Sequence, residues 1–303
     1  MKLIKQSFEI LEQKDFTIKG IKQFVERCAR VSYKSEDRMT DTSYEKFVNM
    51  LESRGHDRPL EFGTVHLKMI LPDFEGFIHS LLTIGMLNNI WIKHAYKGDV
   101  IYITTNYRYY LDIIKYFPNV KEYFTEEDNE YYPKRYTVHM ILDRGVMDEF
   151  RTHVGLSHLA ESTRYCNYSK DKFNNEITFV IPSWMDFPEI SIDLGNYDKT
   201  SVRSKDGNVH IIDTRPPYVE GDFIRSLCEA ESNYLSIVRN GWTPQQAREV
   251  LPLAVKSELI SCGFEDAWKN FFYRRCAKDA HPMAQEIAKP MHKEFIERGF
   301  IDK

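Results

Sequence analysis

The amino-acid sequence predicts an α/β or α+β fold in which helices pack against one mixed or antiparallel sheet. Segments with the two-residue alternation of a strand, such as residues 65–71, are interleaved with segments of helical periodicity, such as residues 18–33. Interleaving of the two kinds of element is typical of a sheet covered by helices. The 303 residues, of which 42% are hydrophobic, are sufficient to form a substantial core.

Apolar periodicity and helix-capping residues define the elements expected in the first half of the chain. Gly and Pro between residues 54 and 61 separate the second helix from the strand that follows it. In order, we expect a short strand and turn (1–18), a helix (18–33), a helix capped by Thr42 or Ser43 and ending near Ser53, a strand (65–71), a helix broken near Gly85 (74–96), a strand (99–105), a helix (106–115) and a polar loop (118–135).

The second half of the chain contains one long stretch without clear periodicity, residues 183–221, for which we expect a long loop or a small hairpin. Its length favours a lid or an interface arm. The other expected elements are a strand (136–142), a helix that follows Asp143 and keeps Val146, Phe150 and Val154 on one face, a strand (176–181), a helix (222–240) ended by Gly241, a helix capped by Thr243 that carries Arg248, a helix (266–277) and a last helix opened by His281.

Composition and charge argue against several classes of function. The formal net charge is −4 and the pI is about 6.2, so no overall basic field attracts a nucleic-acid polymer, whereas a local pocket for one nucleotide remains compatible. The cysteines are scattered without a C-x-x-C pair, which argues against a disulfide framework and against a zinc site. No segment approaches the roughly 18 apolar residues of a membrane span. We therefore expect a cytoplasmic protein with no metal and no membrane association.

Residues 143–168 carry the densest set of chemically useful side chains. Helical periodicity places Arg151 and His153 away from the apolar face, and Ser162 and Arg164 follow shortly after. The arginine guanidinium binds phosphate or carboxylate through two parallel hydrogen bonds. A helix and turn of this composition suit a phosphorylated ligand, although a solvated helix face followed by a loop is an equally simple interpretation.

This segment resembles the signature of the flavin-dependent thymidylate synthases, in which Arg-His-Arg is followed by seven residues, a Ser and an Arg-Tyr pair. Here Thr152, His153 and Val154 occupy the triplet, and Ser162, Arg164 and Tyr165 occupy the later positions. Thr152 and Val154 replace the two arginines. Further segments resemble the family in the expected order: A-R-V-S (29–32), G-H-x-x-P-x-E (55–61), A-R-x-V-L-P (247–252) and W-K-N-F-F-Y-R-R-C-A (268–277).

The resemblance implies roles for individual residues. The catalytic groups would be Arg275, which holds the uracil ring, and Ser162. Contacts with the nucleotide would come from Arg164, Arg248, Arg275, Glu149 and Arg151. Contacts with flavin or folate would come from Ser32, His56, Glu61, His153, Asn270 and His281. Because a fixed guanidinium stabilises negative charge on the ring, Arg275→Ala is expected to lower the rate about a hundredfold or more.

The family reaction methylates C5 of dUMP to give dTMP, with carbon from methylenetetrahydrofolate and electrons from NADPH through FAD. The resemblance thus implies FAD as cofactor, folate and NADPH as cosubstrates, and a homotetramer with shared sites. It also implies a single domain over residues 1–303, with insertions near 85–135 and 183–221. Two alternatives stay open. One is a related enzyme that modifies UMP or dCMP, or that adds a hydroxymethyl group, and the other is a non-catalytic homologue.

Overall fold

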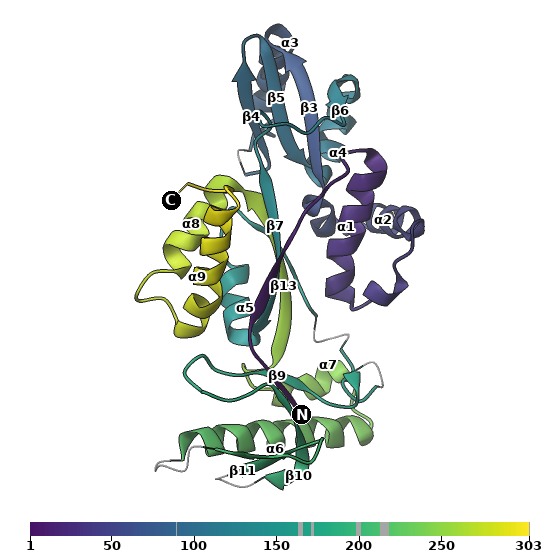
Figure 1. The fold of residues 1–303 in the computed structure, drawn as a ribbon. Helices are drawn as coiled ribbons and strands as arrows, with labels where there is room; N and C mark the ends of the chain where they lie inside the picture. Colours follow the sequence, from purple (N-terminus) through teal and green to yellow (C-terminus); the bar gives the residue numbers. More distant parts are fainter. Residues whose placement is uncertain (89, 163–165, 171–172, 198–200, 213–217, 303) are drawn as a thin grey trace.

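The central sheet of the computed structural model has four antiparallel strands in the order β2-β7-β13-β8 (Figure 1). The strands are β2 (Ser7–Leu11), β7 (Arg135–Asp143), β13 (Lys256–Phe264) and β8 (Ser157–Ala160). β7 and β13 pair over their full lengths, from Asp143 opposite Lys256 to Arg135 opposite Phe264. The structure describes residues 1–88, 90–162, 166–170, 173–197, 201–212 and 218–302.

Both faces of the central sheet are covered, so β13 is buried along nearly all of its length. Leu259 of β13 packs into a core with α5 (Arg144–Arg151), α8 (Glu265–Arg275) and α9 (Pro282–Glu297). The next residue, Ile260, points to the other face and packs with α1 (Ile18–Tyr33). Figure 1 shows α5, α8 and α9 on one side of β13 and α1 on the other.

A second sheet lies at one end of the molecule, in the order β4-β5-β3-β6 (Figure 1). Its elements are β3 (Thr64–Ile70), β4 (Ile92–Lys97), β5 (Val100–Asn106) and β6 (Phe124–Thr125), with α2 (Ser43–Ser53), α3 (Leu71–Thr83), α4 (Tyr107–Tyr116) and the 3-10 turns η1 (Glu36–Arg38), η2 (Arg58–Phe62) and η3 (Pro118–Tyr123) nearby. Residues of α2, α3 and α4 share a hydrophobic core with β3 and β5, which gives this end of the chain its own packing unit.

A third sheet lies at the opposite end, in the order β12-β11-β10-β1-β9, with the long helix α6 beside it (Figure 1). Its elements are β1 (Lys2–Ile4), β9 (Thr178–Val180), β10 (Ile190–Tyr197), β11 (Ser201–Ser204) and β12 (Val209–Ile211), accompanied by α6 (Val219–Arg239), α7 (Pro244–Ala247) and the turn η5 (Arg248–Val250). β1 pairs in parallel with β9, and the other pairs are antiparallel. The N-terminal ammonium group is buried at 2.8 Å from Glu231 of α6.

The α+β class is confirmed, but the single expected sheet is wrong, because the structure has three. The expected helix over residues 74–96 is shorter in the structure, because α3 ends at Thr83. Residues Ile92–Lys97 form the strand β4 instead. β4 and β5 make a hairpin whose two-residue turn starts with Gly98 at φ +59°, a conformation that glycine adopts without strain. Pairing with β5 therefore determines the structure of this segment, whereas residues 99–105 form the expected strand.

Three other expectations are corrected at the level of elements. The helix after Asp143 ends at Arg151, so Val154 does not share its apolar face and is 77% exposed. The expected helix that would carry Arg248 is a single turn, and Arg248 begins η5. The stretch 183–221 is not a long loop: it contains β10, β11 and β12, an antiparallel meander that is larger than the small hairpin of the other expectation and extends the third sheet.

Within the described part of the chain, every helix is too short or too polar to cross a lipid bilayer.

Candidate functional site

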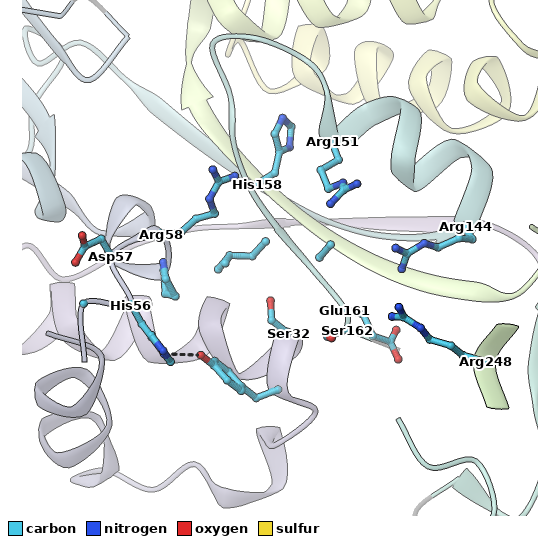
Figure 2. A pocket seen from close by; sticks show the side chains of 15 residues that line it. Ser32, His56, Asp57, Arg58, Arg144, Arg151, His158, Glu161, Ser162 and Arg248 are labelled. Atoms are coloured by element: carbon cyan, nitrogen blue, oxygen red, sulfur yellow. Dashed lines mark hydrogen bonds between the residues drawn. The ribbon is translucent and has the colours of Figure 1, made fainter. Parts of the chain in front are cut away.

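A cavity of about 810 Å³ opens where α1, η2, β8 and η5 meet. It is lined by Ser32, Tyr33, Gly55, His56, Asp57, Arg58, Pro59, Arg144, Arg151, His158, Leu159, Ala160, Glu161, Ser162 and Arg248. In Figure 2, Arg144 and Arg248 lie next to Glu161 and Ser162 at one end of the cavity, and His56 lies at the other end. The site thus combines segments from all parts of the sequence.

Four arginines make the cavity wall strongly cationic. Arg144 and Arg151 project from the first and last residues of α5, and both guanidinium groups contact Asp148, at 3.2 and 3.1 Å. Arg58, at the start of η2, is exposed and has no ion-pair partner among the described residues. Arg248 contacts Glu249 at 3.4 Å. Because four cations surround Asp57 and Glu161, the wall favours an anionic ligand.

His158 forms a buried, neutral part of the wall. Its Nε2 donates to the carbonyl oxygen of His153 at 3.1 Å, and its Nδ1 lies 2.8 Å from the Ser261 hydroxyl. Burial and the nearby charges of Arg58 and Arg151 lower the pKa of His158 to about 4. At neutral pH this imidazole is uncharged and holds the connection between α5 and β8 in place.

Glu161 directly follows β8 and is held by a buried ion network. Its carboxylate lies 2.9 Å from the Lys256 ammonium group and 3.7 Å from that of Lys34. Both lysines also contact Glu258, which accepts a hydrogen bond from His139 at 2.9 Å. Burial raises the pKa of Glu258, but the His139 hydrogen bond and the two lysine charges outweigh it and hold this pKa well below its usual value. The network therefore fixes the residue that precedes Ser162.

The opposite wall carries a free hydroxyl and two rings. The Ser32 Oγ atom is buried and has no hydrogen-bond partner in the described part of the chain. The Tyr33 hydroxyl and the His56 Nδ1 atom are 3.2 Å apart, as Figure 2 shows by a dashed line. This wall therefore offers a hydrogen-bonding group and flat ring surfaces to a ligand.

The structure brings five of the candidate site residues together around this cavity: Ser32, His56, Arg151, Ser162 and Arg248. Arg164, also a candidate, lies outside the described residues. The remaining candidates do not line the cavity, and each contacts another residue of the chain. Glu61 is 7% exposed and bonds Arg108 and the Ser157 hydroxyl, both at 2.6 Å. His153 is 6% exposed and its ring meets the edge of Phe271 at 5.4 Å.

Arg275 and Glu149 form an ion pair with each other outside the cavity. The second guanidinium nitrogen of Arg275 also donates to the Glu149 carbonyl oxygen at 3.0 Å, which fastens α8 to α5. Asn270 accepts a hydrogen bond from Arg274 at 3.3 Å, and His281 caps α9. Within one copy of the chain these side chains serve helix packing and capping.

Two lining residues, Arg144 and His158, were not singled out by the sequence motifs. Arg144 directly follows the N-cap residue Asp143, whose carboxylate accepts from the backbone N–H of Val146 at 2.7 Å. That Asp-Arg-Gly turn is visible in the sequence, but its arginine is placed by contacts of its backbone N–H with Leu253 and Val255, more than 100 residues away. His158 becomes recognisable only once β8 is known to be a strand.

The fold is α+β, and four arginines line its cavity. A model of the family described as thymidylate synthase complementing protein matches residues 134–298, more than half of the chain, and the chain belongs to this family. The matched region contains the central sheet except β2, the helices α5, α8 and α9 that cover it, and most of the third sheet with α6 and α7.

Solved structures give a more distant likeness. Two structures of a UMP/dUMP methylase, PolB from Streptomyces cacaoi, one bound with 5-Br dUMP and one with 5-Br UMP, are 15% and 13% identical to this chain, each with a TM-score of 0.42. The likeness covers 98% of this chain and 93% and 91% of those chains. Similarity at this level carries no argument about the chemistry. No match was found among curated proteins.

Proposed function

We propose that this protein methylates C5 of a pyrimidine nucleotide. In its specific form, the proposal is conversion of dUMP to dTMP with methylenetetrahydrofolate as carbon donor, FAD as cofactor and NADPH as reductant. Membership of the thymidylate synthase complementing protein family supports the class of reaction. The observation that carries the proposal is the gathering of four arginines and Ser162 around one cavity.

The end of the cavity formed by Arg144, Arg248 and Ser162 suits the phosphate of a nucleotide. Guanidinium groups bind phosphate with fixed two-point geometry, and a hydroxyl adds a further hydrogen bond. Arg144 and Arg151 extend from α5, whose apolar residues pack in the core beside the central sheet, and both guanidinium groups contact Asp148. In this protein they supply the positive charge that Thr152 and Val154 lack.

The pyrimidine ring needs a cation beside it, because C5 becomes a nucleophile only as negative charge builds on the ring. A preorganised guanidinium in a dry site stabilises that charge. Within one copy of the chain, Arg58 and Arg151 are the guanidinium groups available for this role, because Arg275 is paired with Glu149 outside the cavity. Arg275 reaches a nucleotide only from a second copy, as the shared sites of the proposed homotetramer would allow.

The wall formed by Ser32, Tyr33 and His56 has the chemical groups that suit a flavin. Its free buried hydroxyl suits a polar edge of the isoalloxazine, and its rings suit the flat face. When bound, FAD would supply the hydride for reduction of the transferred one-carbon unit. Ser32 and His56 would orient the ring. Glu61, His153, Asn270 and His281 are proposed flavin or folate contacts that, like Arg275, would come from another copy.

The proposal is tested by supplying dUMP, UMP or dCMP with methylenetetrahydrofolate, FAD and NADPH and measuring product mass. The expected product is dTMP. Arg248→Gln should weaken dUMP binding about tenfold or more, because a hydrogen bond to a charged group is lost. Arg239→Gln, an exposed arginine at the end of α6 that does not line the cavity, is the matched control and should bind normally.

Other outcomes of the same panel decide between the alternatives. A methylated or hydroxymethylated product from UMP or dCMP alone would replace dUMP as the substrate. If no nucleotide binds and FAD gives neither a thermal shift nor bound flavin absorbance, the protein is a non-catalytic homologue and the proposal fails.

A further inference from the structure

A second hollow, of about 620 Å³, adjoins the nucleotide cavity at the C-terminal end of α1. It is lined by Arg30, Tyr33, Lys34, Ser35, Arg38, Ser43, Lys46, Phe47 and Met50. Tyr33 lines both spaces, and its hydroxyl lies 3.2 Å from His56 on the cavity side. The two spaces therefore share one aromatic side chain in their walls.

The lining of this hollow contains four cations and no acidic side chain. Arg30 is held by Glu26, at 2.6 Å, and Lys34 by Glu258. Arg38 on η1 and Lys46 on α2 are exposed. Neither side chain has a hydrogen-bond or ion-pair partner in the described part of the chain. Unpaired cations that converge on one hollow, in a chain of net charge −4, create a local attraction for anions.

The floor of the hollow is formed by side chains that pack against one another and are hydrogen-bonded. The Arg30 guanidinium lies 4.5 Å from the centre of the Phe47 ring, and Tyr33 packs edge-on against the same ring at 6.1 Å. The Arg30 side chain is also fixed by a hydrogen bond of 3.1 Å to the carbonyl oxygen of Ser35. Arg38 and Lys46 are thus exposed charges beside a packed floor, an arrangement that suits an anionic chain.

We infer that this second hollow binds the anionic tail of a cosubstrate whose ring end occupies the adjoining cavity. This inference rests on the proposed function. The tail is recognised as a carboxylate or phosphate, and two cosubstrate classes carry one: the glutamate carboxylates of a folate and the additional phosphate that distinguishes NADPH from NADH. Arg38 and Lys46 bind the tail, and Tyr33 separates it from the ring.

The experiment compares matched ligands that differ only in the tail. One pair is a reduced folate with one or three glutamates, and the other is NADP⁺ and NAD⁺, with affinities measured by calorimetry on the full chain. The wild-type protein should bind the more anionic member of at least one pair about three- to tenfold more tightly, since two exposed charge pairs each contribute modestly. This gain should shrink at high ionic strength.

Arg38→Gln/Lys46→Gln should abolish the gain, because it should lower the affinity for the more anionic member of the pair more than the affinity for the less anionic one. Lys19→Gln/Lys278→Gln is the matched control, because it removes two exposed charges outside both spaces and should keep the gain. Loss confined to the folate pair identifies a carboxylate tail, and loss confined to the dinucleotide pair identifies a phosphate.

The inference is overturned if the wild-type protein shows no gain in either pair, or if the double variant keeps it. Binding of dUMP is measured on the same samples. Normal dUMP binding without a tail effect would reject the second hollow alone, whereas absence of dUMP binding would reject the proposed function.

Discussion

At the scale of single residues, Lys34 combines a strained backbone with a buried charge. It ends α1 in the left-handed conformation, at φ +49°, where a non-glycine residue costs about 1–2 kcal/mol. Its side chain contacts Glu258 and approaches Glu161. A glycine would relieve the backbone but would leave two carboxylates to share Lys256. A strained backbone position thus carries a charge that the buried network uses.

Removal of Lys256 should destabilise the protein strongly. Lys256→Met leaves Glu161 and Glu258 buried with Lys34 as their remaining lysine partner, and an uncompensated buried charge costs about 3 kcal/mol or more. The free energy of unfolding from urea titration measures this loss. Lys68→Met is the matched control, since Lys68 pairs with Glu127 at the exposed surface. The control should lose no more than about 0.5 kcal/mol, and equal losses in the two variants would contradict the importance of the network.

His66 should make the protein less stable in mild acid. It is 2% exposed and stacks between Phe16, at 4.4 Å, and Tyr132, at 4.0 Å. Burial lowers its pKa to about 4 from an ordinary value of 6.5. Between pH 6.5 and 4 the unfolded chain therefore binds a proton at His66 that the folded chain does not bind. The free energy of unfolding is highest above pH 6.5 and decreases as the pH falls through this range.

The size of this pH effect should be on the order of 2–3 kcal/mol between pH 7 and 4 for His66. His66→Phe keeps a flat ring in the stack and removes the titrating group. Urea unfolding at pH 7, 5.5 and 4 should show a shallower decrease for the variant, with the remaining slope due in part to His158. An unchanged slope would show that His66 does not titrate in this range.

At the scale of elements, the turn between α5 and β8 positions one wall of the cavity. Gly155 adopts φ +99°, and a Cβ atom there would meet Ala267 of α8 at 3.2 Å. Gly155→Ala should destabilise by about 1–2 kcal/mol, because an L side chain is strained at this φ. The change should also weaken nucleotide binding, since β8 leads directly to Ser162.

Gly76 provides a control in which the same substitution should raise stability instead of lowering it. It lies inside α3, is exposed, and a Cβ atom there would have no neighbour within 4 Å. Gly76→Ala should stabilise the helix by about 0.5–1 kcal/mol. Thermal unfolding of both variants tests the argument, and a stabilised Gly155→Ala protein would show that the turn is not constrained as described.

Local patterns predicted the elements that carry their own signals. α1 has a helical apolar stripe, and the expected bounds of α1 and α4 agree with the structure within one residue. β13 was not predicted, although it is the strand on which the central sheet is built. A strand buried on both faces shows no alternation, and β13 is defined by its neighbours β7 and β8, which lie far away in the sequence.

The candidate site divides in the same way. Ser162, His56 and Arg248 belong to motifs with recognisable spacing, and they meet at the cavity. Arg144 and His158 reach the cavity only because β7, β13 and β8 align in one register, a long-range property. Arg275 belongs to a motif but does not line the cavity, because within one copy of the chain it pairs with Glu149. Motif spacing thus identifies residues, whereas sheet register determines which of them meet.

At the scale of the whole molecule, the cavity joins parts that otherwise have separate cores. Ser32 comes from α1, Arg58 from η2 beside the second sheet, Ser162 from the end of the central sheet, and Arg248 from η5 beside the third sheet. A ligand that contacts all of them connects units that could otherwise open independently. Nucleotide binding should therefore act on the stability of the entire chain.

Saturation with dUMP should slow hydrogen exchange at both ends of the molecule at once. At a ligand concentration of about 100 times Kd, binding stabilises the folded chain by about 2.7 kcal/mol. Mass spectrometry should detect slower exchange of backbone amides in η2 and in η5, because Arg58 and Arg248 lie on different walls of one cavity. Deoxyuridine, which lacks the phosphate, is the matched control and should lose the protection in η5 first, since the phosphate is what Arg248 is proposed to bind. Protection restricted to one segment, or identical protection by deoxyuridine, would mean that the nucleotide does not bridge the cavity and that its cations serve a different ligand.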